Sequence, residues 1–169
     1  MANARGKKVD TTYLSIDNAE ERGFLHRDYI AHCLRWSHVV KYLGTSQRYK
    51  SARVLDVGCG KEMPLSKLLH SSRMGTAWYG AVDVAPLVTP EQFRNASWKP
   101  HKLWSKTDVC TLKPDDFEAP PTAIVCFEVA EHVEPDHCRR MLAKFHELLE
   151  DEGRVFISTP CYDAHTGAA

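Results

Sequence analysis

Several features that mark particular classes of protein are missing from this 169-residue sequence. No apolar run approaches the roughly 18–20 residues of a membrane-spanning helix, so no membrane partner is expected. The first ten residues carry three basic side chains but no apolar stretch behind them, which argues against a secretory signal. None of the six cysteines forms a Cys-x-x-Cys pair, so neither a zinc ribbon nor a disulfide framework is indicated. These absences favour one globular domain with reduced thiols in the cytoplasm.

The sequence also has no net charge, yet its charges are unevenly distributed. Residues 22–53 carry seven Lys or Arg and one acid, whereas residues 115–152 carry eleven acids and three basic residues. The basic segment, which includes Trp36, Tyr42 and Tyr49, is compatible with a nucleic acid held through phosphate contacts and stacking. The zero net charge and the lack of a recognisable nucleic-acid-binding module weigh against that partner. A small hydroxylated molecule is equally compatible, and the sequence predicts no oligomeric state.

The most informative stretch is a glycine turn that follows an apolar segment. Residues 54–57 predict a short buried strand, and Gly58 and Gly60 then allow a tight turn. Residues 64–70 have helical spacing and begin with a proline, which is tolerated best in a first turn. A strand, a glycine turn and a helix open a nucleotide-binding βαβ unit, in which Asp56 at the strand end can accept hydrogen bonds from a ligand.

Strands and helices alternate along the rest of the chain. Further strands are expected at residues 77–84, 102–107, 122–127 and 154–159, and a helix at residues 135–150. Gly153 is expected to stop this helix, whose predicted buried side consists of Cys138, Met141, Leu142, Phe145, Leu148 and Leu149. Asp83 ends the second strand 23 residues after Gly60, a spacing at which an acid can bind ribose hydroxyls. The alternation predicts a parallel sheet with a ligand at the carboxyl ends of its strands.

A long helix is expected before the sheet, from about residue 17 to residue 43, with Gly44 as its stop. Its apolar and aromatic stripe consists of Leu25, Tyr29, His32, Trp36, Val40 and Leu43. The stripe favours packing against the domain; the alternative is a lid over a ligand pocket, with Arg22, Arg27 and Tyr29 nearest the mouth. The predicted organisation is a flexible N-terminus (1–15), a helical lid or cap (16–50) and the sheet domain (51–169).

Five features occur in a fixed order over residues 52–160, namely the stretch 54–60, Asp83, Asp108, the stretch 127–133 and the stretch 153–160. Together they resemble the motifs of the class I S-adenosylmethionine-dependent methyltransferases. The resemblance implies an α/β three-layer Rossmann-like fold with strand order 3-2-1-4-5, and O-methyl transfer to a hydroxyl of a small molecule or nucleic acid. The cofactor-binding residues that it implies are Asp56, Gly58, Cys59, Gly60, Asp83, Val84, Asp108, Val109, Phe127 and Glu128.

Two features depart from that family's pattern. Glu62 stands where the first motif commonly has a third glycine, and a carboxylate there suits a sulfonium cofactor better than a pyrophosphate. This carboxylate and the absence of a Tyr-x-x-x-Lys pair argue against the alternative of an NAD-dependent oxidoreductase. The family's sheet normally has seven strands, whereas this sequence ends about nine residues after the fifth. The sheet is therefore either unusually short or incomplete because the sequence is a fragment, and the fragment is favoured. Because part of the usual sheet is not in this sequence, a non-catalytic methyltransferase-like binding module is a further alternative.

Glu128, Glu131 and His132 are the candidate catalytic and metal-binding residues. If Glu128 begins a helical turn, the three side chains lie at i, i+3 and i+4 on one face. Two carboxylates and an imidazole then form a site for Mg²⁺ or Mn²⁺, which would lower the pKa of an acceptor hydroxyl. The pattern resembles metal-dependent O-methyltransferases of small-RNA 3′ ends and of the ubiquinone pathway. In the RNA enzymes a further histidine completes the site; the candidate counterpart here is His165, and the alternative is a ligand beyond Ala169. The alternative is a metal-free lining of the pocket.

Overall fold

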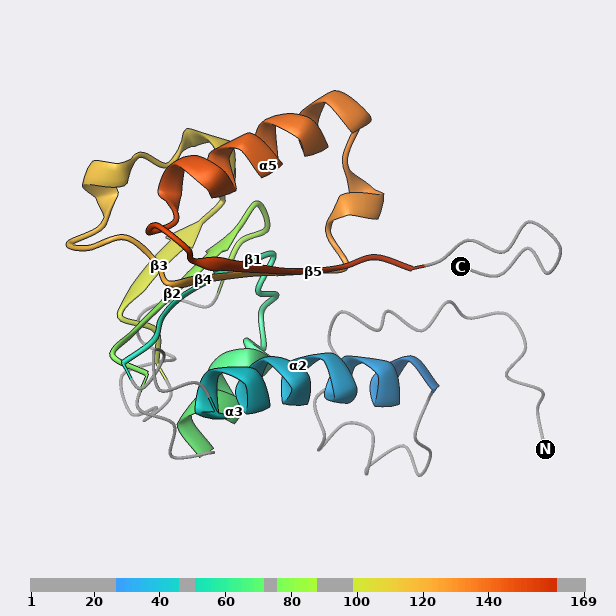
Figure 1. Cartoon of the computed structure of the whole chain (residues 1–169). Helices are drawn as coiled ribbons and strands as arrows, with labels where there is room; N and C mark the ends of the chain where they lie inside the picture. Colours follow the sequence, from blue (N-terminus) through green and yellow to red (C-terminus); the bar gives the residue numbers. More distant parts are fainter. Residues whose placement is uncertain (1–26, 46–50, 72–75, 88–98, 161–169) are drawn as a thin grey trace, which may run out of the picture.

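A five-stranded parallel sheet forms the centre of the fold (Figure 1). The computed structural model describes residues 27–45, 51–71, 76–87 and 99–160. The strands are β1 (Arg53–Val57), β2 (Trp78–Asp83), β3 (Lys102–Ser105), β4 (Ala123–Phe127) and β5 (Arg154–Ser158). They are hydrogen-bonded in the order β3-β2-β1-β4-β5, and every neighbouring pair is parallel. The predicted fold class and strand order are therefore confirmed.

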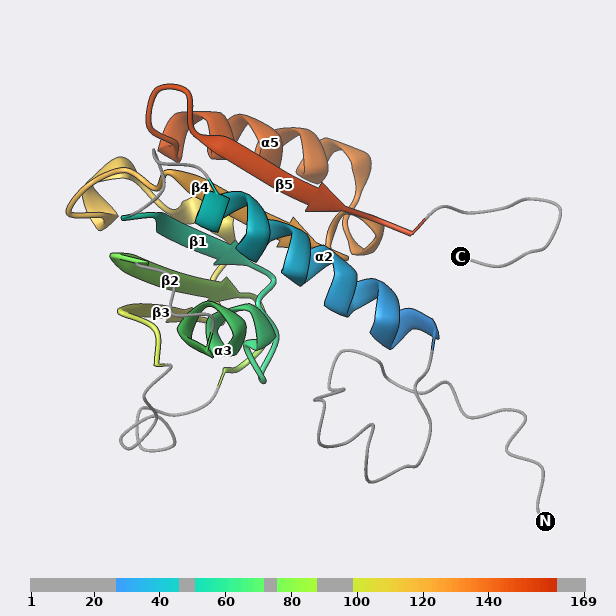
Figure 2. The same ribbon diagram turned by 60° about the horizontal axis from the view of Figure 1, so that its bottom comes forward.

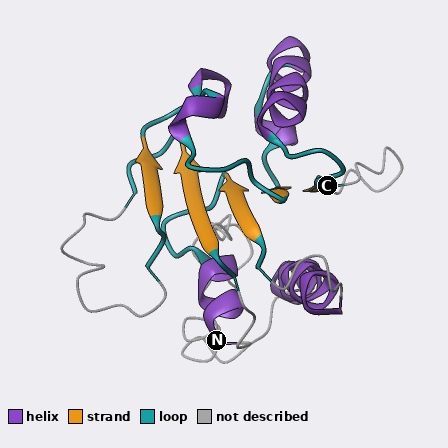
Figure 3. Cartoon of the chain, turned by 60° about the vertical axis from the view of Figure 1, so that its left-hand side comes forward, coloured by secondary structure: helices purple, strands orange, loops and turns teal. Residues whose placement is uncertain are grey.

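Helices cover both faces of this sheet, giving three layers (Figures 1 and 3). α2 (Arg27–Thr45) and α3 (Pro64–Ser71) lie on one face. α5 (Pro135–Leu148) lies on the other face, together with the short 3-10 helices η3 (Val109–Thr111) and η4 (Pro114–Asp116). A third 3-10 helix, η5 (Ala130–His132), lies between β4 and α5. Both α3 and α5 begin with proline, whose missing N–H costs no helical hydrogen bond at that position.

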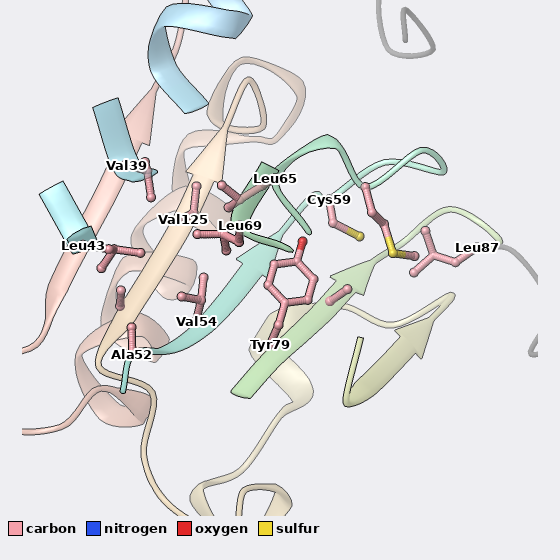
Figure 4. Close-up of a cluster of buried hydrophobic side chains, with 13 residues drawn as sticks. Val39, Leu43, Ala52, Val54, Cys59, Leu65, Leu69, Tyr79, Leu87 and Val125 are labelled. Atoms are coloured by element: carbon pink, nitrogen blue, oxygen red, sulfur yellow. The ribbon is translucent and has the colours of Figure 1, made fainter. Parts of the chain in front are cut away.

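Alternating residues of the strands supply a separate hydrophobic core to each face. In β1, Val54 packs on the side of α2 and α3, whereas Leu55 and Val57 pack on the side of α5. Figure 4 shows part of the first core, in which the buried residues include Val39, Leu43, Ala52, Val54, Cys59, Leu65, Leu69, Tyr79, Leu87 and Val125. β1 and β4 are covered on both faces, so four of the five residues in each strand are buried, and β4 is a continuous apolar run.

The end of α5 differs from the sequence-based prediction. α5 ends at Leu148 with Leu149 as its C-cap, so Gly153 is not its stop. The turn into β5 instead places Glu152 in the left-handed region at φ 61°, and Gly153 is packed so closely that an added Cβ would lie 2.8 Å from Leu149. Leu142, expected on the buried side, is 44% exposed because it lies one position, about 100° around the helix, beyond the buried stripe.

Some sequence-based expectations lie outside the described residues. These are the segment at residues 1–15, the start of the N-terminal helix, Arg22 and His165. Arg27 and Tyr29 belong to α2, but their side chains are outside the described part. Among the described helices, none combines the length and the apolar character that a membrane crossing requires.

Candidate functional site

The turn between β1 and α3 brings backbone atoms to the carboxyl end of the sheet. Gly58 and Gly60 have φ angles of 70° and 65°, in the left-handed region that favours glycine. The Gly58 N–H donates to the Val82 carbonyl oxygen at 2.9 Å, which holds the turn against β2. A Cβ on Gly58 would lie 2.3 Å from Cγ2 of Val129, so a side chain has no room there. The tight turn predicted from the two glycines is therefore present.

Asp83, the acid predicted to bind the same ligand, lies directly against this turn. Its Oδ2 accepts from the Gly60 N–H at 3.0 Å, and its Oδ1 accepts from the Ala85 N–H at 2.8 Å. Each carboxylate oxygen retains a second acceptor position, so Asp83 can still bind ligand hydroxyls. Val84, the next residue, is 74% exposed and presents an apolar surface at the same edge. The glycine turn and the acid thus come together, although they are 23 residues apart in the sequence.

Asp56 is buried beneath the turn. It is 6% exposed and accepts a hydrogen bond from the Tyr79 hydroxyl, whose ring belongs to the core in Figure 4. Burial raises the pKa of Asp56 to about 7; the hydrogen bond from Tyr79 opposes this rise and the charge of Asp83 adds to it. The Asp56 carboxyl therefore changes its charge near neutral pH, and a cationic ligand would favour its ionised form.

A pocket lies between the glycine turn, the end of β4 and α2. It is lined by His32, Trp36, Asp56, Gly58, Cys59, Gly60, Glu62, Pro64, Phe127 and Glu128. Six of the predicted cofactor-binding residues are in this lining, namely Asp56, Gly58, Cys59, Gly60, Phe127 and Glu128. The other four, Asp83, Val84, Asp108 and Val109, are not among the lining residues. Figure 2 shows that the first turns of α2 extend beyond the carboxyl ends of the strands, which places this helix over the pocket.

The lining combines carboxylates with aromatic rings. Asp56, Glu62 and Glu128 contribute three carboxyl groups, and no Lys or Arg is among the lining residues. The rings of His32 and Trp36 are stacked with their centroids 5.3 Å apart. Lys67 lies 3.0 Å from Glu62 and Arg35 lies 3.4 Å from Glu128, so the basic side chains that balance two of these carboxylates lie outside the lining. The pocket itself offers carboxyl oxygens and ring surface, which suit a ligand with positive charge and apolar surface better than a pyrophosphate.

Glu128 is held in an unusual backbone conformation at the end of β4. Its φ is 56°, which is uncommon for a residue with a Cβ. The Glu128 N–H donates to the Ser158 carbonyl oxygen at 2.9 Å, and the Ser158 hydroxyl donates to Glu128 Oε1 at 2.8 Å. The Arg35 guanidinium of α2 lies 3.4 Å from the same oxygen. Glu128 therefore ties the ends of β4 and β5 to α2 at the edge of the pocket.

Glu131 and His132 do not share a helical face with Glu128, so that expectation is wrong. Glu128 precedes η5 and has a left-handed backbone, and only Glu131 and His132 belong to the 3-10 helix. Glu131 Oε2 accepts from the Thr159 hydroxyl at 3.3 Å, whereas Glu131 Oε1 lies 3.8 Å from His132 Nε2. The His132 side chain is 76% exposed and does not line the pocket. Among the described residues, the cluster of His, Cys, Asp and Glu side chains that could hold a metal ion lies elsewhere.

Asp108 and Val109, predicted on the adenine side, follow β3 at the same end of the sheet. Asp108 caps η3, because its Oδ1 accepts from the Cys110 N–H at 2.9 Å. Val109 is 4% exposed and packs in the core beneath α5, so only its backbone can contact a ligand. Cys59 lines the pocket, but burial raises the pKa of its thiol far above the usual range, so the thiol stays neutral.

Sequence reasoning missed several groups at the site. His32 and Trp36 belong to the stripe of α2 that favours packing against the domain. The alternative, a lid over a ligand pocket, puts Arg22, Arg27 and Tyr29 nearest the mouth and not these two residues. Their contact with the pocket distinguishes them, and only the fold shows it. Arg35, Tyr79 and Ser158 act through contacts with residues 23 or more positions away, for which no local sequence signal exists.

The sequence model of a family described as a methyltransferase domain matches residues 26–168. The chain belongs to this methyltransferase family. A ubiquinone biosynthesis O-methyltransferase of Xanthomonas euvesicatoria pv. vesicatoria (strain 85-10) is 30% identical over 125 residues, which cover 71% of this chain and 48% of that protein. The corresponding protein of Xylella fastidiosa (strain 9a5c) is 34% identical over 122 residues, covering 70% of this chain and 46% of that protein. The methyltransferase chain thus spans about half the length of these curated relatives.

Solved structures of other methyltransferases share the fold. Magnesium protoporphyrin IX methyltransferase from Synechocystis PCC 6803 with bound SAM matches with a TM-score of 0.56 and 18% identity, covering 73% of this chain and 57% of that one. The N-methyltransferase NodS from Bradyrhizobium japonicum WM9 in complex with S-adenosyl-L-homocysteine has the same TM-score and identity, and the match covers 88% of this chain and 72% of that one. The resemblance to class I S-adenosylmethionine-dependent methyltransferases is confirmed, whereas the similarity to their metal-dependent branch stays a prediction.

Proposed function

We propose that this methyltransferase domain binds S-adenosylmethionine in the pocket beside the glycine turn and transfers its methyl group to a hydroxyl of a small molecule. The observation that carries the proposal is the lining of three carboxyl groups and several aromatic rings around a Gly-x-Gly turn. S-adenosylmethionine has a sulfonium and an ammonium group and no phosphate. Its charge therefore suits this lining, whereas the pyrophosphate of NAD does not.

Each end of the cofactor has a partner among the described residues. Asp83, held by two backbone N–H groups, is our candidate for the ribose hydroxyls, because each of its oxygens can accept one more hydrogen bond. Asp108, at the end of β3, is our candidate for the adenine amino group. Asp56 and Glu128 lie nearer the cationic methionine end, and Glu128 is fixed there by Ser158 and Arg35.

Methyl transfer requires a collinear sulfur, methyl carbon and acceptor oxygen in a site from which water is excluded. His32, Trp36 and Phe127 supply ring surface around the pocket that can exclude water. The hydroxyl must also lose its proton, and Glu128 is the lining carboxylate that we propose to orient or accept it. A bound Mg²⁺ or Mn²⁺ would instead lower the pKa of the hydroxyl. Substitution of His132, one of the three candidate metal ligands, tests this alternative.

The curated relatives support a small-molecule acceptor. Both are named as O-methyltransferases of ubiquinone biosynthesis, and they match over 70% or more of this chain. The names of these relatives also agree with the resemblance of the motif at residues 128–132 to O-methyltransferases of the ubiquinone pathway. We therefore place a hydroxylated aromatic compound ahead of a nucleic acid as the acceptor class.

Calorimetry with S-adenosylhomocysteine and with NAD tests the cofactor. We expect micromolar binding of S-adenosylhomocysteine and no measurable binding of NAD; tight binding of NAD alone would contradict the proposal. Release of S-adenosylhomocysteine is then followed with a catechol-type compound and with a short RNA as acceptors. Turnover with RNA alone would contradict the acceptor class, and binding of cofactor without turnover on any acceptor would favour a binding module.

A further inference from the structure

A second cluster of ligand-type side chains lies on the α5 side of the sheet. Asp108, Cys110 and His137 each offer one atom, and these three atoms all lie within 4.8 Å of one another. Cys110 belongs to η3 and His137 to the first turn of α5, and these two elements pack together. All three side chains are partly buried, so they are held in place yet accessible to a small ion.

The distances within this cluster match those around a bound transition metal. His137 Nε2 lies 3.4 Å from Asp108 Oδ2 and 3.9 Å from Cys110 Sγ. Ligands at about 2.0–2.3 Å from a tetrahedral Zn²⁺ are separated from each other by about 3.3–3.8 Å. Only small side-chain movements are therefore needed for the three atoms to share one ion.

The local structure explains why these atoms converge. Asp108 Oδ1 accepts from the Cys110 N–H at 2.9 Å, so Oδ2 faces His137 of α5 and the cysteine is held two residues after Asp108. α5 begins at Pro135, which places His137 opposite that oxygen. The capping bond thus fixes two of the three ligands before any ion is present.

We propose that Asp108, Cys110 and His137 form a site for a divalent transition metal ion of the Zn²⁺ class, and that the ion opposes cofactor binding. The second part rests on the proposed function, in which the Asp108 carboxylate binds the adenine amino group. A carboxylate bound to a metal cannot accept the hydrogen bond from the adenine amino group in the same way. By linkage, the metal therefore lowers the affinity for the cofactor, and the cofactor lowers the affinity for the metal. A sulfur, a nitrogen and an oxygen ligand favour Zn²⁺ over Mg²⁺ or Ca²⁺.

Binding of the ion changes the protonation of two ligands. Burial, and then the charge of Asp108, raises the pKa of the Cys110 thiol, so the metal must displace its proton. The Arg140 guanidinium lies 3.1 Å from His137 Nδ1 and holds the imidazole proton on Nε2. That proton must move to Nδ1 when Nε2 binds the metal, and exposed Arg140 must turn away. Replacement of Arg140 is therefore expected to strengthen metal binding.

Titration of the full chain with Co²⁺ tests the site, because thiolate coordination gives an intense charge-transfer band in the near ultraviolet. We expect the band in the wild type, its loss in Cys110→Ser and His137→Gln, and its retention in the controls Cys33→Ser and His146→Gln. Arg140→Ala should reach half-saturation at several-fold lower Co²⁺. A wild type without the band, or a band that survives Cys110→Ser, would overturn the site.

The opposing effect is measured with S-adenosylhomocysteine in the presence and absence of saturating Zn²⁺. We expect Zn²⁺ to weaken binding about tenfold in the wild type and not in Cys110→Ser. Equal affinity with and without Zn²⁺ would overturn the inhibitory role while leaving the Co²⁺ result in place. Absence of S-adenosylhomocysteine binding in metal-free buffer would instead contradict the proposed function, so the two failures are distinguishable.

Discussion

The two halves of the sheet's carboxyl edge hold their acidic side chains in different ways. On the β1–β2 half, backbone N–H groups of Gly60 and Ala85 fix Asp83. On the β4–β5 half, side chains from two other elements fix Glu128, through the Ser158 hydroxyl and the Arg35 guanidinium. The first arrangement depends on a strand end and a glycine turn, whereas the second depends on which side chains the fold brings together.

At the carboxyl edge, a close contact between Val129 and Gly58 links the two halves, in addition to the pairing of β1 with β4. Val129, directly after Glu128, packs over Gly58 so closely that a Cβ on the glycine would lie 2.3 Å from it. The glycine is therefore required both for the turn of the first half and for the position of the chain in the second.

The largest effect is expected from Asp56→Asn in the first half. Burial raises the pKa of Asp56 to about 7 from the model-peptide value of 3.8. The folded state therefore binds a proton that the unfolded state has lost, and stability decreases as pH rises from about 4 to about 7. The decrease attributable to Asp56 is up to about 4 kcal/mol. Asparagine is neutral at every pH, so Asp56→Asn should be more stable than the wild type at pH 8 and similar to it at pH 4.

Urea unfolding of both proteins between pH 4 and pH 8 measures this difference. Asp115, an exposed residue of η4, provides the control, and Asp115→Asn should follow the wild type throughout. A stability difference between Asp56→Asn and the wild type that does not change with pH would contradict the raised pKa.

Asp83→Ala should produce the next largest effect, on ligand affinity. The substitution removes the acceptor for two backbone N–H groups and, under our proposal, for the ribose hydroxyls. Hydrogen bonds to charged groups contribute roughly 1.5–3 kcal/mol each, so S-adenosylhomocysteine should bind about a hundredfold more weakly. Calorimetry measures the affinity, with Asp115→Ala as the control. Unchanged affinity in Asp83→Ala would place the ribose elsewhere.

The contrast between the halves explains how much of the site the sequence could predict. The strands and the pairing of Gly60 with Asp83 follow from local patterns with fixed spacing, whereas the order of the sheet follows from the resemblance to the methyltransferase family. The expectation that Glu128, Glu131 and His132 share one helical face is wrong, because Glu128 has a left-handed backbone conformation. This conformation is held by a hydrogen bond from Ser158, thirty residues away. A contact over that distance leaves no periodic pattern that sequence reasoning could detect.

A smaller effect is expected when the link between α2 and Glu128 is removed. Arg35 and Glu128 side chains are 27% and 20% exposed, so their ion pair is only partly screened by solvent. Arg35→Met keeps the length of the side chain and removes its charge, and we expect a loss of about 1 kcal/mol of stability and about fivefold in cofactor affinity. A double-mutant cycle with Glu128→Gln isolates the pair, and fully additive losses would show that the two residues are not coupled.

The smallest effect should come from His132→Gln, and it decides whether the β4–β5 half contains a metal site. The imidazole is 76% exposed and is 3.8 Å from Glu131, so its removal should change cofactor affinity and turnover less than about twofold. Glu128→Gln, the matched variant within the pocket lining, should reduce turnover about tenfold or more.

Both proteins are assayed with Mn²⁺ and with EDTA. Activity that requires Mn²⁺ and disappears in His132→Gln would mean that His132 turns toward Glu128 when a metal binds. The second half of the edge would then be organised by the ion in addition to Ser158 and Arg35.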